Sequence, residues 1–271
     1  MVIAIGGLGL MGGSLALALR GRCRRRLGWD PDPATVALAL TRRVVDEADA
    51  RPEPVLARAD AVVLAAPVRE IIILLGHLPA MTERRLVVLD LGSTKAEIVR
   101  AMNMLPARFD PIGGHPMCGK EVSGLAHSEA GLFRSAPFVL IPLRRTSPRA
   151  RGLVAEIVEA IGAQPLWIDA DTHDRWVAAT SHLPFLVAAA LVLATPEEAY
   201  PLVGPGFRST TRLAASDPQM MHGILQTNRR AVLSALKAFR LELDRLEESL
   251  SREDAGPIAN RIAAAAALRR S

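Results

Sequence analysis

The chain has 271 residues, enough for one large domain or two modest ones, and we expect two. Half of its residues are hydrophobic and 23% are charged, a balance that supplies a buried core and excludes a disordered protein. The net charge of +5 favours anionic small molecules and nucleic acid about equally, but aromatic residues make up only 4%, too few for a single-strand binder, so we predict no nucleic-acid partner.

Short apolar runs alternate with helical stretches over the first two thirds of the chain. Continuous apolar strands separated by helices predict a parallel sheet that is buried on both faces. From Asp171 onward no strand-like run appears, so we expect an α/β domain over residues 1–169 and an all-α domain over residues 170–271. The predicted strands are VIAI at 2–5, AVVLAA at 61–66, LVVLDLG at 86–92, FVLIP at 138–142 and PLWID at 165–169.

A glycine-rich turn follows the first predicted strand and precedes a helical run. At that place a GxGxxG pattern lets the backbone approach a pyrophosphate at the helix N-terminus. The turn therefore predicts a Rossmann-type dinucleotide-binding domain. The expected cofactor-binding residues of the turn are Gly7, Gly9, Leu10, Met11 and Gly12.

Asp30 lies 18 residues after Gly12, at the end of a short second strand over residues 27–29. A carboxylate there accepts hydrogen bonds from ribose hydroxyls and repels a 2′-phosphate, so we expect NAD rather than NADP. A run of arginines precedes that strand, at its far end from the ribose, and is interpreted as a solvated basic edge. These are Arg20, Arg22, Arg24, Arg25 and Arg26.

Two polar segments follow strands further along the chain, at residues 90–95 and 113–124. In an open α/β sheet, ligands bind at the carboxyl ends of the strands, so both segments should face the cofactor. The second segment contains His115, and a histidine beside a nicotinamide can take the proton of a substrate hydroxyl while hydride leaves the adjoining carbon. Dehydrogenase chemistry is the leading hypothesis.

The remaining third predicts long helices. The apolar run at 183–194 is too short to span a bilayer and is interpreted as a buried helix, and no membrane partner is predicted. A helix with Asp217 as its N-cap should run toward Asp254. Its apolar seam has a period of 3.5 residues, which fits packing within the domain and a homodimer interface equally well. The seam comprises Val232, Leu236, Phe239, Leu243, Leu246 and Leu250.

Neither cysteine suggests a disulfide framework or a thiolate metal site, and the first residues lack the pattern of an export signal, so a cytoplasmic protein is expected. His173 and His182 are nine residues apart, which on an unbroken helix places them on opposite faces. We therefore predict no metal site. Cys118 is interpreted as a small packing residue.

The chain resembles the prephenate and arogenate dehydrogenases of tyrosine biosynthesis in five motifs and in the later Asn228. The resemblance implies NAD-dependent oxidative decarboxylation of prephenate to 4-hydroxyphenylpyruvate, with arogenate as the alternative substrate. The motifs are IGGLGLMGGSLA at 5–16, DLGSTK at 90–95, GGHPMCGKEVSGLAHSEAGLF at 113–133, THDRWVAATSHLPFLVAAAL at 172–191 and GFRSTTRLAASDP at 206–218.

The same resemblance implies roles for five side chains. His115 would accept the proton of the ring hydroxyl, and Ser93 would orient His115 and touch the nicotinamide or that hydroxyl. Arg212 would bind the ring carboxylate, for which a planar guanidinium is suited. His182 and Glu121 would shape the substrate pocket, although a core role for His182 stays open.

Other residues leave alternatives open. Lys95 would lie near the site or only begin a helix, and Arg208 would be a second carboxylate anchor or a surface charge. The family commonly has an acidic residue at the position of Ser209 and a Trp at that of Met221, which mildly favours prephenate over the ammonium-bearing arogenate. The rivals are a β-hydroxyacid dehydrogenase, whose expected lysine is missing between residues 171 and 195, and a non-catalytic NAD sensor.

Overall fold

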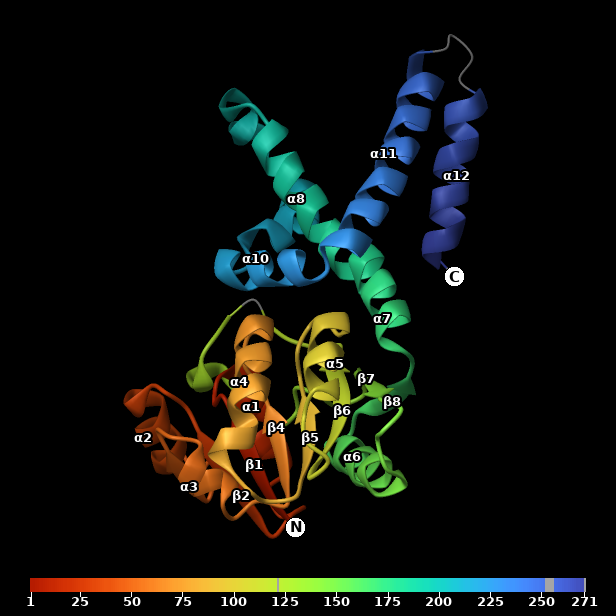
Figure 1. The fold of residues 1–271 in the computed structure, drawn as a ribbon. Helices are drawn as coiled ribbons and strands as arrows, with labels where there is room; N and C mark the ends of the chain where they lie inside the picture. The colour runs from red at the N-terminus through yellow and green to blue at the C-terminus, as the bar shows by residue number, and fades with distance from the viewer. Residues whose placement is uncertain (121, 252–255, 271) are drawn as a thin grey trace.

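The computed structural model describes residues 1–120, 122–251 and 256–270. Its core is an eight-stranded sheet in the order β3-β2-β1-β4-β5-β6-β7-β8 (Figure 1). All six predicted strands are present, as β1, β2, β4, β5, β7 and β8. The strands are β1 Val2–Gly6, β2 Arg25–Trp29, β3 Glu47–Asp49, β4 Ala61–Leu64, β5 Leu86–Asp90, β6 Phe109–Pro116, β7 Pro137–Pro142 and β8 Gln164–Trp167.

Helices cover both faces of the sheet, because alternate residues of each central strand point to opposite sides. In β1, Ile3 and Ile5 face the hydrophobic core under α1, α2 and α6, while Ala4 faces the core under α3, α4 and α5. The six helices are α1 Leu10–Ala18, α2 Pro33–Thr41, α3 Glu53–Leu56, α4 Val68–Met81, α5 Ala96–Asn103 and α6 Pro148–Ala160.

The prediction of an all-parallel sheet buried on both faces is wrong at the β7 end. β7 runs antiparallel to β6, and the edge strand β8 is exposed along its length. A parallel return needs a crossover, usually a helix, but among the described residues between β6 and β7 the only helical element is the 3-10 turn η1 Leu125–His127. The motif expected to follow a strand also lies inside one, since residues 113–115 belong to β6.

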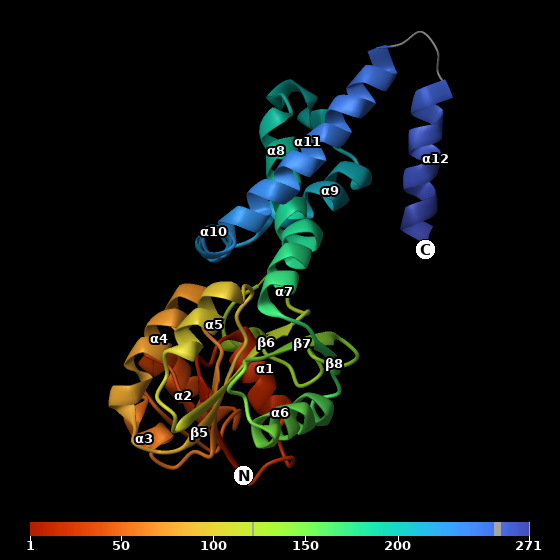
Figure 2. The same cartoon turned by 45° about the vertical axis from the view of Figure 1, so that its right-hand side comes forward.

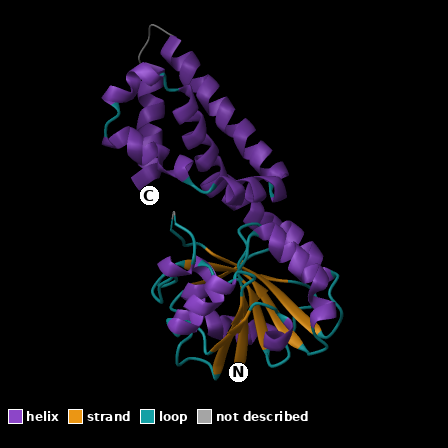
Figure 3. Cartoon of the chain, turned by 90° about the vertical axis from the view of Figure 1, so that its left-hand side faces the viewer, coloured by secondary structure: helices purple, strands orange, loops and turns teal. Residues whose placement is uncertain are grey.

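Among its described residues the second part of the chain contains helices joined by loops and no strand, and it lies beyond the carboxyl ends of the parallel strands (Figures 1 and 3). It begins directly after β8. Its elements are α7 Ala170–Val177, the π-helical segment η2 Ala178–His182, α8 Leu183–Ala194, η3 Glu197–Leu202, α9 Pro205–Thr211, η4 Arg212–Ala215, α10 Pro218–Thr227, α11 Arg229–Ser251 and α12 Gly256–Arg270.

Helix α8 differs from the expected buried helix. Only Ala188 of α8 is buried within this chain, and Leu193 is 86% exposed. The helical stretch also begins at Ala170 rather than at 183, so with 25 residues it is long and apolar enough to cross a membrane by length and composition alone. Such a stretch equally fits a surface that a second protein chain covers.

The long helix expected from Asp217 is two helices. Asp217 caps α10 as predicted, accepting a hydrogen bond from the Met220 N–H at 2.7 Å. The helix then breaks at Asn228, whose side chain turns inward to the α7 region, and α11 begins at the next residue. The predicted seam therefore lies on α11, where Val232 is buried and Leu250 is 69% exposed. Figure 2 shows α8 and α11 extending away from the sheet.

Candidate active site

The glycine turn between β1 and α1 is tightly packed where the chain reverses and open where a ligand would approach. Gly7 has φ +87°, and a Cβ on Gly12 would lie 1.9 Å from the Gly7 carbonyl oxygen, so a side chain is excluded there. A Cβ on Gly9 would meet nothing within 4 Å. Helix α1 also has no side-chain cap, which leaves its first N–H groups directed at that open space. This fits a pyrophosphate at the helix N-terminus.

Asp30 follows β2, as the sequence predicts, and connects that strand to the glycine turn. One carboxylate oxygen accepts the Leu8 N–H at 2.8 Å, and the other accepts the Asp32 N–H at 3.0 Å. These bonds hold the carboxylate at the carboxyl end of β2, the place where a dinucleotide ribose binds in this fold. Its interaction with a ribose stays a prediction.

The run of arginines before β2 is only partly a solvated edge. Arg26 is 6% exposed, and its guanidinium binds the Asp46 carboxylate and the carbonyl oxygens of Ala16 and Val44. The prediction is therefore wrong for Arg26, because a guanidinium with several fixed acceptors is stable when buried. Arg25 remains exposed and pairs with Glu47.

His115 lies near the end of β6, opposite Val139 of β7. Its place depends on Gly114, because a Cβ there would lie 2.6 Å from the Asp90 carbonyl oxygen and 2.8 Å from a Leu89 methyl carbon. The glycine thus lets β6 pass closely over β5 just before the histidine. His115 is partly buried at the edge of the sheet that faces the helical domain.

A chain of three side chains joins His115 to the helical domain. His115 Nδ1 lies 2.8 Å from His173 Nε2, and His173 Nδ1 lies 2.8 Å from a carboxylate oxygen of Asp174. A carboxylate only accepts, so His173 donates through Nδ1 and accepts through Nε2. His115 consequently donates through Nδ1, and its Nε2 carries the free lone pair.

The surroundings of His115 keep that lone pair free of a proton. Burial is the main cause that holds the pKa of His115 well below its usual value, and the neighbouring His173, Lys95 and His182 lower it further. A neutral histidine with Nε2 unprotonated is a proton acceptor at physiological pH.

His182 ends the π-helical segment η2 and is buried. The Asn228 amide nitrogen donates to the Asp174 carbonyl oxygen at 2.7 Å and lies 3.3 Å from His182 Nδ1. Asn228 is the donor in the second contact too, so His182 accepts through Nδ1 and presents Nε2–H as a donor. Burial lowers the pKa of His182 to about 4, which keeps it neutral.

The opposite-face argument for His173 and His182 assumed an unbroken α-helix, and the π-helical segment η2 interrupts the helix between them. Both His173 and His182 act electrostatically on His115. Within residues 1–120, 122–251 and 256–270, no group of three or more His, Cys, Asp or Glu side chains is arranged to hold a metal ion.

The other predicted residues are more scattered. Ser93 is partly buried after β5, and no hydrogen bond between described residues joins it to His115. The side chain that contacts the His115 ring is His173, and the expected role of Ser93 stays a prediction. Arg212 and Arg208 are exposed on η4 and α9, and Glu121 lies outside the described residues. Lys95 does lie near the site, fully buried beneath β6.

His173 and Asp174 were not expected as site residues. Both side chains are buried, although they lie on α7, a helix whose polar sequence predicts that its side chains are exposed. The available signal was the adjacent His-Asp pair near the start of a helix whose N-cap is Asp169. Asp174 also accepts the N–H groups of Lys95 and Ala96, at 2.8 and 2.9 Å, and so connects the two domains.

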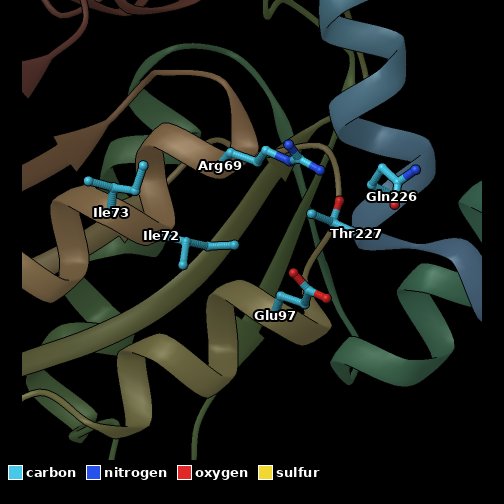
Figure 4. A pocket seen from close by; sticks show the side chains of 6 residues that line it. All are labelled: Arg69, Ile72, Ile73, Glu97, Gln226 and Thr227. Atoms are coloured by element: carbon cyan, nitrogen blue, oxygen red, sulfur yellow. The ribbon is translucent and has the colours of Figure 1, made fainter.

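A groove of about 420 Å³ lies between the helical domain and the sheet domain (Figure 4). It is formed where α10 rests on α4 and α5, beside the 2.8 Å hydrogen bond between the Thr94 and Thr227 hydroxyls. None of the predicted site residues that the structure describes lines it. The lining residues are Arg69, Ile72, Ile73, Glu97, Gln226 and Thr227.

Two family models match consecutive parts of this chain. The prephenate dehydrogenase nucleotide-binding domain matches residues 15–166, and the prephenate dehydrogenase dimerization domain matches residues 169–263. The chain belongs to the prephenate dehydrogenase family. It is accordingly an NAD-dependent oxidoreductase, and the predicted fold class, a Rossmann-type domain followed by a helical dimerisation domain, is confirmed.

Named relatives and solved structures agree with this family. The prephenate dehydrogenase of Bacillus subtilis is 34% identical over 263 residues, which cover 93% of this chain and 71% of that protein. The cyclohexadienyl dehydrogenase of Zymomonas mobilis is 29% identical over 93% of this chain and 89% of its own length.

Among solved structures, the Aquifex aeolicus prephenate dehydrogenase in complex with hydroxyphenyl propionate and NAD+ has a TM-score of 0.91 and 30% identity, covering 100% of this chain and 97% of that one. The Synechocystis arogenate dehydrogenase has a TM-score of 0.87 and 30% identity, covering 100% and 99%. A 3-hydroxyisobutyrate dehydrogenase of Mycobacterium tuberculosis shares the fold alone, at 16% identity and a TM-score of 0.55.

Proposed function

We propose that this enzyme converts prephenate to 4-hydroxyphenylpyruvate and CO2 in the cytoplasm, as a step of tyrosine biosynthesis. The observation that carries the proposal is the Asp174–His173–His115 chain, which leaves Nε2 of His115 as a free base at the edge of the sheet where the cofactor turn also lies. Cys23 and Cys118 are free thiols, which supports a reducing compartment.

NAD, held by the glycine turn and Asp30, supplies the hydride acceptor when bound. His115 accepts the proton of the ring hydroxyl at Nε2 as hydride leaves the carbon that bears it. Loss of the ring carboxylate as CO2 returns a bonding pair to the ring, which becomes aromatic, and His115 returns the proton to the phenolate oxygen. His182 presents Nε2–H to a polar group of the substrate, Arg212 binds the ring carboxylate, and Glu121 helps to shape the substrate pocket.

Prephenate is preferred to arogenate in this proposal because Ser209 stands where the family commonly has an acidic residue. The test is NADH formation by the purified enzyme with each acid. We expect kcat/KM for prephenate to exceed that for arogenate, because no carboxylate at position 209 pairs with the arogenate ammonium. A preference for arogenate would overturn the substrate assignment, and no NADH from either acid would overturn the function.

Cofactor preference supplies a second prediction. We expect kcat/KM to be at least about 100-fold higher with NAD than with NADP, because a 2′-phosphate beside the Asp30 carboxylate places like charges together. Asp30→Asn should narrow this ratio, whereas Asp32→Asn, which removes a neighbouring exposed carboxylate, should preserve it. Equal rates with both cofactors in the unmodified enzyme would contradict the assignment.

We infer that the helical domain, residues 170–271, forms a homodimer, while residues 1–169 bind the cofactor. Apolar side chains left uncovered on α8 and α11, among them Leu193 and Leu250, support this, as does the dimerization-domain match. Sedimentation should give twice the 29.0 kDa chain mass. Leu243→Asp combined with Leu250→Asp should shift the equilibrium to monomer. Leu40→Asp, an exposed leucine of α2, should not; a monomeric unmodified protein would refute the dimer.

A further inference from the structure

Lys95 is a fully buried cation directly beneath the strand that carries His115. Its side chain is 0% exposed, pairs with the equally buried Asp90, and donates to the Gly114 carbonyl oxygen at 2.6 Å. Arginine supplies nearly all the cationic side chains of this chain, and the lysines are only Lys95, Lys120 and Lys237. A compact ammonium at this position is therefore a specific feature, since a planar guanidinium needs more room.

The Lys95–Asp90 pair makes the hydrogen bonds to β6 that β5 no longer makes beyond the end of the β5–β6 ladder. The β5–β6 ladder ends where Leu89 faces Ile112, before β6 reaches its glycines. Beyond that point one Asp90 oxygen accepts the Gly114 N–H at 3.1 Å, while the Lys95 ammonium binds the Gly114 carbonyl. Both backbone polar groups of the residue before His115 are thus held by side chains rather than by a neighbouring strand.

The backbone of Lys95 holds the other side of the histidine pair. Its N–H donates to Asp174 at 2.8 Å, and Asp174 in turn fixes His173, whose Nε2 meets His115. Lys95 therefore contacts the residues that hold each histidine of the pair. Its side chain binds Gly114, which precedes His115, and its main chain binds Asp174, which binds His173. Burial of the pair costs free energy that only good geometry and added hydrogen bonds offset, and this site has both.

We propose that Lys95 is a positioning residue for His115: its ammonium locks β6 at Gly114 so that the His115–His173 hydrogen bond is held across the two domains. The proposal rests on the proposed role of His115 as the base. Lys95 does not touch the reacting atoms and acts only through the strand and the charge beneath it.

The positive charge of Lys95 also affects the pKa of His115, which its packing alone would not do. The groups facing His115 are His173 and His182 from the helical domain and, beneath β6, Lys95 with Asp90, while Asp174 lies behind His173. The positive charge of Lys95 is one of the causes that lower the pKa of His115. Burial lowers the pKa of Lys95 itself, and the carboxylates of Asp90 and Asp174 oppose that shift.

Lys95→Met tests the proposal, with Arg58→Met, which breaks the exposed ion pair with Glu47, as the matched control. We expect kcat to fall about 10- to 100-fold, the scale of a displaced catalytic group, with KM for prephenate changed less than about threefold. The acid limb of kcat/KM should move up by about one pH unit, because removing a nearby positive charge favours protonated His115. Arg58→Met should change none of these.

A second measurement does not depend on turnover. NMR titration of the His115 ring protons, in enzyme without substrate or cofactor, should show a raised pKa in Lys95→Met. An unchanged titration together with kcat within twofold of the unmodified enzyme would overturn the proposal, and so would a loss confined to KM. Because the titration needs no substrate, it separates this inference from failure of the proposed reaction.

Lys95→Met leaves the Asp90 carboxylate buried without its cation, and the single variant does not serve as a test if that lone charge unfolds the protein. In that case Asp90→Asn combined with Lys95→Met carries the test, since no lone charge remains and thermal unfolding reports whether the domain is intact. A folded double variant should show the same loss in kcat. A folded double variant with unmodified kcat would overturn the proposal.

Discussion

Replacing His115 by asparagine should lower kcat by about 10²- to 10⁴-fold, the range that a positioned general base contributes. The amide donates to His173 Nε2 in place of the imidazole, but it offers no basic nitrogen to the substrate hydroxyl. KM for prephenate should change little, because the base is not the group that binds the acid. Initial rates of NADH formation across a range of prephenate concentrations measure both constants.

The matched control is His77→Asn, which changes an exposed histidine of α4 and should leave both constants as they are. The pH profile adds an independent check. Since the pKa of His115 is held well below 6.5, the base stays unprotonated as the pH falls through that value, and the acid limb of kcat/KM should lie below pH 6.5. Full activity in His115→Asn would remove the base from the mechanism.

The sequence predicted the sheet-and-helix order because buried parallel strands are continuous apolar runs with helices between them. It did not predict β6, whose residues include Pro111, Gly113 and Gly114, which are weak strand formers. That strand persists because long-range contacts hold it: Asp90 and Lys95 bind its backbone, and β7 pairs with it along five residues. The antiparallel pairing followed from a connection without a crossover helix, which periodicity does not reveal.

The site was partly predictable for a similar reason. His115 was predicted from its motif and Asp30 from its spacing from the glycine turn, and the roles of both stay predictions. The partner of His115 was missed because His173 is 58 positions away, and the contact forms only where the first helix of the second domain meets β6. The resemblance favoured Ser93 as the orienting group, a role that stays a prediction, and it did not reveal that His173 contacts the His115 ring.

Replacing Asp174 should have the second-largest effect on activity, because several hydrogen bonds converge on its carboxylate. It accepts from Lys95 N, Ala96 N and His173 Nδ1, and its carbonyl oxygen accepts from Asn228. Asp174→Asn keeps the shape but places a donor among donors. One of these N–H groups then loses its partner in a buried place, which costs about 1–3 kcal/mol of stability.

The larger effect of Asp174→Asn should be on kcat, which we expect to fall about 10²- to 10⁴-fold, because an amide nitrogen facing His173 Nδ1 reverses the tautomer. His173 would then donate through Nε2 to His115, whose Nδ1 must accept, so that Nε2 of His115 carries a proton and no longer serves as the base. Asp171→Asn, an exposed neighbour on the same helix, is the control and should keep full kcat. If Asp174→Asn lowered the melting temperature but kept kcat, the carboxylate would only connect the two domains. It would not set the tautomer of His115.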